Sequence, residues 1–147
     1  MIVLQPSVGL ARDTKIDYDL LSSILTRAVK IKKRVFFKVI KSNKDYSYYE
    51  EIDEEYIIAI NLDDGNDLPE VVKGILHELR HHIQECVFKI KTTDFNDSFR
   101  RYYASPEEID ARKFEKLSAE VVNIYKNFKK IEVKYKDLKL DSYNEPV

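Results

Sequence analysis

The chain has 147 residues, 44% of them hydrophobic, and its 25 Lys and Arg residues nearly balance its 26 Asp and Glu residues, for a net charge of -1. This composition fits a single globular domain over residues 1–147, and the balanced charge gives no overall attraction to nucleic acid or to an anionic membrane, so we expect neither as a partner. The single cysteine, Cys86, excludes an internal disulfide and a cysteine-rich zinc site, so histidines and carboxylates would have to bind any metal.

The N-terminal segment, residues 1–6, has neither the basic residues nor the long apolar run of a signal peptide. No stretch of the sequence approaches the roughly 20 apolar residues that a helix needs to cross a bilayer. We therefore expect a soluble, cytoplasmic protein.

The first half of the chain predicts one helix and two strands. Apolar residues recur at helical spacing over residues 17–31, where Asp17 or Asp19 could cap the helix start. Residues 35–40 and 55–62 are rich in β-branched and aromatic side chains and predict strands. The charged, tyrosine-rich segment between them is compatible with either another strand or a surface loop.

A long helix is predicted over residues 68–90. Asp67, Pro69 and Glu70 form a typical helix start. Apolar residues then follow at spacings of three and four, which indicates that one face of the helix packs on the core. These are Leu68, Val72, Ile75, Leu79, Ile83, Cys86 and Ile90. Residues 92–103 show no clear period and predict a connecting loop.

The last predicted helix begins at Ser105 and runs to about residue 130. Ser105 is expected as the N-cap, Pro106 as the first helical residue and Glu108 as the partner in a capping box. Residues 131–135 alternate in polarity and favour a short strand, and residues 136–147 are expected to form a flexible tail. The elements together predict an α+β fold.

The sequence His77-Glu78-Leu79-Arg80-His81 is an HExxH motif within the predicted helix over residues 68–90. On an ideal helix the two histidines lie about 40° apart, so both rings can reach one ion, and they point away from the apolar stripe. Gly74, one turn earlier on that face, leaves room for a ligand or a strand. The alternative is an exposed polar helix surface.

This spacing suits a catalytic zinc, which takes three protein ligands and keeps one position for water. Glu78, next to His77, is positioned to accept a proton from that water and thus to act as the general base. His82 lies toward the apolar side and is expected to pack or to support the site. Cys86 is expected to be a small buried side chain.

The HExxH motif is followed by Glu108-Ile109-Asp110-Ala111, which matches E-x-x-A, and this pair of motifs resembles the gluzincin group of zincin metallopeptidases, in particular small ImmA/IrrE-like and phage-encoded minimal zincins. The resemblance implies a zincin-like fold, with a small sheet packed on the HExxH helix and a second long helix. It implies Zn²⁺ bound by His77, His81 and Glu108, and a peptide or protein substrate.

Helical spacing measured from Phe114 favours Asp110 over Glu108 as the third ligand, so the two carboxylates remain alternatives. Relatives often carry an acid that orients a zinc histidine at the position of Arg112, so Asp110 or a backbone carbonyl would have to replace it.

The resemblance also assigns roles to a strand and a tyrosine. The strand over residues 55–62 would pair with an extended substrate, unless it is an ordinary core strand. Tyr102, or less favourably Tyr103, would stabilise the oxyanion. The main alternative function is a non-catalytic zincin-fold module that binds a protein partner.

Overall fold

The sheet of the protein has four strands in a mixed arrangement. The structure is a computed structural model that describes residues 1–63, 65–90 and 103–143, with side chains through residue 134. The strands are β1 (Ile2–Pro6), β2 (Val35–Lys41), β3 (Tyr48–Ile52) and β4 (Glu55–Ile60). Their order is β1-β2-β4-β3, in which β3 alone runs antiparallel to its neighbour.

Strand β4 pairs with β2 on one side and with β3 on the other. Both rows of its main-chain hydrogen-bonding groups therefore face neighbouring strands, and it cannot add a substrate strand. The expectation that residues 55–62 pair with substrate is wrong for this reason, and the core-strand alternative holds. Within the described sheet, β1 and β3 are the edge strands.

The helices of the described chain are α1 (Val8–Thr14), α2 (Tyr18–Ala28), α3 (Leu68–Cys86), α5 (Pro106–Phe114) and α6 (Ser118–Tyr143), with a 3₁₀ turn, η1 (Glu115–Leu117), before α6. Along β2 the side chains of Val35, Phe37 and Val39 are buried while those between them are more exposed. This alternation shows that helices cover one face of the sheet at β2. Helix α2 contacts β1, and α3 contacts both β3 and β4.

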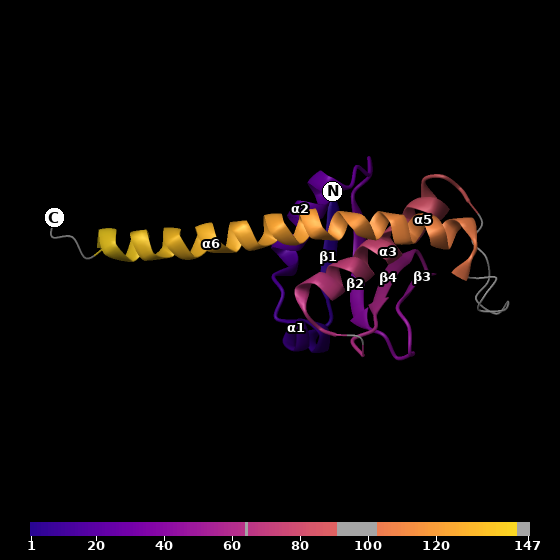
Figure 1. Cartoon of the computed structure of the whole chain (residues 1–147), viewed down its shortest axis with the longest axis horizontal. Coiled ribbons are helices and arrows are strands. Elements are labelled where there is room, and N and C mark those ends of the chain that lie inside the picture. Colours follow the sequence, from indigo (N-terminus) through magenta and orange to yellow (C-terminus); the bar gives the residue numbers. More distant parts are fainter. Residues whose placement is uncertain (64, 91–102, 144–147) are drawn as a thin grey trace.

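Helix α6 runs across α2 and α3 and extends beyond the rest of the chain (Figure 1). The side chains of Val121, Val122 and Tyr125 in its first half join the core. The Tyr125 hydroxyl accepts a hydrogen bond from the backbone N–H of Asp17, so α6 also contacts the start of α2. The expected α+β class is confirmed, and no helix among the described residues has the length and apolarity to cross a membrane.

The ends of two predicted elements require correction. Helix α3 begins at its Asp67 cap as predicted but ends at Cys86, because the chain turns into the left-handed region at Lys89 (φ 57°). The predicted strand over residues 131–135 is wrong, since these residues continue α6. Alternating polarity over five residues, with no neighbouring strand to pair with, does not outweigh the hydrogen bonds gained by continuing a helix that has already formed.

Two elements of the N-terminal half, β1 and α1, were not predicted from the sequence. The tyrosine-rich segment, for which a strand and a surface loop were alternatives, contains β3. The helix predicted over residues 17–31 is present as α2 but ends earlier, at Ala28, and the Asp17 side chain caps its start by accepting a hydrogen bond from the N–H of Leu20. The predicted loop over residues 92–103 lies outside the described residues except for Tyr103.

Candidate metal centre

His77 and His81 lie one turn apart on α3, with their Nε2 atoms 3.3 Å from each other. Leu79, between them in sequence, is fully buried on the opposite side of the helix. The amphipathic pattern of α3 therefore fixes Leu79 in the core and turns both imidazoles to the other face, as the spacing predicted.

Glu108 comes from the first turn of α5 and contacts both histidines. Its Oε2 lies 3.0 Å from Nε2 of His77, and its Oε1 lies 2.7 Å from Nε2 of His81. Ser105 caps α5, as predicted, by accepting the N–H of Glu108 at 3.4 Å. The Glu108 side chain is directed to the histidines, so it belongs to the candidate site and does not act as the capping-box partner.

His77, His81 and Glu108 form the candidate metal site, since one ligand atom from each lies within 4.8 Å of the others. Asp110 is not part of this group, because its carboxylate binds the Arg80 guanidinium at 2.8 and 3.3 Å. The helical angle measured from Phe114 was misleading because Phe114 and Asp110, one turn apart on α5, both contact Arg80 and so mark the Arg80 side of the helix.

The outer nitrogen of each imidazole also has a partner. Nδ1 of His81 lies 2.9 Å from Oε1 of Gln84, a side chain that is only 1% exposed. Nδ1 of His77 lies 3.5 Å from Oε2 of Glu115 in η1. Since both partner atoms are acceptors, they favour the tautomer with the proton on Nδ1. In the neutral rings, the Nε2 lone pairs then face Glu108.

Gln84 is itself held in place. Its amide nitrogen donates to the carbonyl of Glu107 at 2.9 Å and to Oδ2 of Asp110 at 2.8 Å. Asp110 thus contacts Gln84, which contacts His81, but Asp110 itself touches no histidine. Gln84 was not predicted, although its position three residues after His81 on the same helix was a usable signal.

Glu115 was also missed, because the predicted helix ran unbroken through η1. The structure directs Arg112 elsewhere: its Nη2 donates to the carbonyl of Tyr103 at 2.7 Å, and its guanidinium carbon lies 3.7 Å from the centre of the Tyr103 ring. The acid that contacts Nδ1 of His77, Glu115, therefore comes three residues after Arg112.

Glu78 is 4% exposed, and this burial raises the pKa of its carboxyl to about 7, although the charges of His81 and His77 oppose the shift. Burial lowers the pKa of His77, but hydrogen bonds to Glu108 and Glu115 outweigh it and raise that pKa to about 10. The pKa of His81 is raised in the same way, chiefly by Glu108. Without metal, the centre therefore holds protons at neutral pH.

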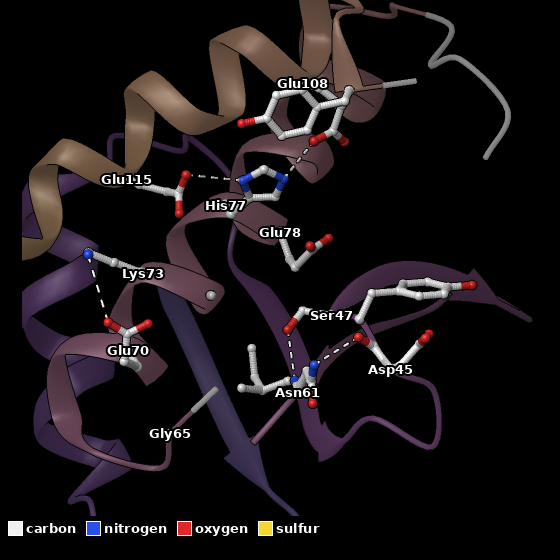
Figure 2. Close-up of a pocket in the computed structure, with 14 residues that line it drawn as sticks. Asp45, Ser47, Asn61, Gly65, Glu70, Lys73, His77, Glu78, Glu108 and Glu115 are labelled. Carbon is white, nitrogen blue, oxygen red and sulfur yellow. Dashed lines mark hydrogen bonds and ion pairs between the residues drawn. The ribbon is translucent and has the colours of Figure 1, made fainter. Parts of the chain in front are cut away.

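A cleft of about 410 Å³ opens beside the centre. Figure 2 shows His77 between Glu108 and Glu115. Glu78 and Ser47 also line this cleft. Tyr103 also lines this cleft, whereas Tyr102 lies outside the described residues. A Cβ on Gly74 would lie 3.1 Å from Cδ1 of Ile60, so this glycine allows β4 to approach α3 closely.

Two other side chains of α3 lie away from the centre. His82 is 3% exposed, its Nδ1 lies 2.9 Å from the Tyr49 hydroxyl, and its ring packs edge-on against Phe37 and Tyr56. Its burial lowers its pKa to about 4. Cys86 is partly exposed, not buried as expected, with Sγ 3.9 Å from the Tyr49 hydroxyl. Neither residue belongs to the candidate metal site.

Comparisons with protein-family models, curated proteins and solved structures find no match for this chain. The donor set itself suits a borderline metal ion, since two imidazole nitrogens and a carboxylate oxygen converge and the remaining imidazole nitrogens are already hydrogen-bonded. The chain thus contains a largely buried His-His-Glu candidate metal site.

Proposed function

We propose that the protein is a zinc-dependent metallopeptidase with a zincin-like fold, acting on a peptide or protein substrate. One observation supports this most directly: Nε2 of His77, Nε2 of His81 and the Glu108 carboxylate converge at the edge of a cleft that Glu78 also lines. Two imidazoles and a carboxylate are a ligand set of catalytic zinc sites in peptidases.

His77, His81 and Glu108 would hold the zinc ion. Zinc with three such ligands makes water a nucleophile near neutral pH and polarises a carbonyl group. The Glu78 carboxylate accepts the proton that the attacking water loses and later gives it to the departing amine. In the metal-free protein the pKa of this carboxyl is about 7, so it can both gain and lose a proton near neutral pH.

The substrate would bind along the cleft on the β3 side. Strand β3 is an edge strand of the described sheet, and Tyr46 and Ser47, just before it, line the cleft. An extended peptide can add to such an edge through main-chain hydrogen bonds. The oxyanion role predicted for Tyr102 remains a proposal, and Tyr103 is the alternative that lines the cleft.

Metal content and cleavage together test this function. Protein purified without chelators should contain about one zinc per chain by elemental analysis, and it should cleave members of a quenched-fluorescent peptide library. A chelator should stop cleavage and added zinc should restore it. Protein that binds no zinc at micromolar concentration would contradict both parts of the proposal. Zinc binding without any cleavage would favour the non-catalytic module.

A further inference from the structure

A second groove, of about 980 Å³, lies between the α2–β2 connection and the C-terminal end of α3, and it shares no lining residue with the metal cleft. Two of the charged side chains that line it are acidic, Glu51 and Glu85. Six are basic, namely Lys30, Lys32, Lys33, Arg34, Arg80 and Lys89. The groove therefore carries an excess of positive charge in a protein whose net charge is -1.

The excess charge comes from the α2–β2 connection. Arg80 is compensated by Asp110, at 2.8 Å. Lys30, Lys32 and Lys33 are exposed, and no ion pair joins them to an acid in the part of the chain that the structure describes. Neighbouring like charges repel one another, and an anionic partner would relieve that repulsion.

Apolar side chains lie at the opposite wall of the groove. Val87 and Phe88, just after α3, are 51% and 53% exposed. The Arg80 guanidinium lies 5.3 Å from the centre of the Phe88 ring and 5.0 Å from that of Phe114. Lys89, in the left-handed region that lysine rarely adopts, follows directly and adds a cation beside this wall.

We propose that this groove binds an acidic segment of another protein whose Asp and Glu residues alternate with large apolar residues. The acidic side chains would lie against Lys30, Lys32 and Lys33, and the apolar ones against Val87 and Phe88. Charge complementarity selects an anionic partner, and the exposed apolar wall selects one that also has apolar side chains.

The shape of the groove favours a protein segment over the other polyanions. An anionic membrane is flat and would not fill a concave groove. Single-stranded nucleic acid is bound by a row of aromatic side chains on which successive bases stack, whereas Phe88 is the one exposed Phe or Tyr among the described residues that line this groove. The interaction needs no metal, so it stands independently of the proposed peptidase activity.

Fluorescence anisotropy provides the test, with a fluorescein-labelled peptide in which Asp and Glu alternate with Leu and Phe, and with the full-length protein in a metal chelator. Reversing two charges at the rim, Lys32→Glu with Lys33→Glu, should weaken binding by about tenfold or more. The matched control is Lys126→Glu with Lys130→Glu, two exposed positions on α6, which should stay within about twofold of the parent.

One further variant and one altered peptide test the apolar part of the interaction. Phe88→Ser should weaken peptide binding while keeping every charge, and a peptide with Ser in place of Leu and Phe should bind less tightly to the parent protein. All variants are checked for native circular dichroism and cooperative unfolding. Absence of peptide binding, equal loss in the α6 control, or equal or tighter binding of random single-stranded DNA or of anionic phospholipid vesicles would each overturn the proposal.

Discussion

Gln84 links His81 to Asp110: its amide oxygen faces Nδ1 of the imidazole, and its amide nitrogen donates to the carboxylate. The amide of Gln84 cannot simply be turned over, because its nitrogen also donates to the carbonyl of Glu107. The orientation of the amide therefore fixes which nitrogen of His81 carries the proton when the ring is neutral. A side chain outside the HExxH motif sets the lone pair that the motif offers to a metal.

Gln84→Leu removes this hydrogen bond while keeping a similar volume. We expect zinc affinity to fall by about 10- to 100-fold, because the His81 ring loses its orientation and its fixed tautomer. Competition with a chromophoric chelator measures the change. Gln5→Leu, at an exposed position on β1, is the matched control and should bind zinc like the parent. Unchanged affinity in a folded Gln84→Leu variant would remove the positioning role.

Glu108→Gln and Asp110→Asn compare the two carboxylates that the sequence left as alternatives. Glu108→Gln should weaken zinc binding far more, because Glu108 alone of the two contacts Nε2 of both histidines. Asp110→Asn should have a smaller effect, transmitted through Gln84. The same competition assay measures both. The ligand assignment would pass to Asp110 if the order of the two effects were reversed.

Glu78→Gln separates metal binding from catalysis. The variant should keep about one zinc per chain, since Glu78 is not in the candidate ligand set, and should lose about 10²-fold or more in kcat. Elemental analysis and cleavage of a verified peptide substrate are the measurements. Full activity with bound zinc would show that another group takes the proton.

Zinc binding should release protons at pH 7. In the metal-free centre the pKa of His77 is raised to about 10 and that of His81 is also raised, so these rings hold protons that a metal must displace. Apparent affinity should therefore rise as pH increases from 7 toward 10. Calorimetry in two buffers of different ionisation enthalpy counts the protons released. Glu115→Gln should reduce the count, and identical heats in both buffers would contradict the prediction.

His82 should make the metal-free protein sensitive to acid. Burial lowers its pKa from 6.5 to about 4, so between these values the unfolded chain binds more protons than the folded chain. The stability contributed by neutral His82 is present above about pH 6.5 and is lost as pH falls to about 4, by roughly 3 kcal/mol at most. Urea unfolding with a chelator present, compared with His82→Phe, should show a shallower acid slope in the variant. Parallel slopes would exclude this role.

Long periodic segments were predictable from the sequence, because one side of α2 and α3 must pack on the core. The two histidines of the candidate metal site could be assigned for the same reason, since their direction follows from that of Leu79. Strand β1 has only five residues, and its pairing with β2 and its contact with α2 are tertiary information that residues 2–6 do not carry.

The rest of the site depends on a bend that the sequence did not reveal. Residues 115–117 have good helix-forming side chains, yet they form a 3₁₀ turn, and all helical angles counted across them were wrong. This is why Glu115 was missed. Whether a loop or a strand occupies the segment before β4 was likewise decided by pairing between β3 and β4, which is tertiary information.

The turn η1 also has a consequence for the newly made chain. The HExxH helix and the described sheet are complete by residue 86. Glu108, in α5, and Glu115, the first residue of η1, come later in the chain. The first two thirds of the chain therefore contain His77 and His81 but neither Glu108 nor Glu115. Two histidines alone would bind zinc weakly, because a catalytic zinc site has three protein ligands. The proposed activity would therefore begin only after α5 has packed on α3 and brought Glu108 to the two histidines.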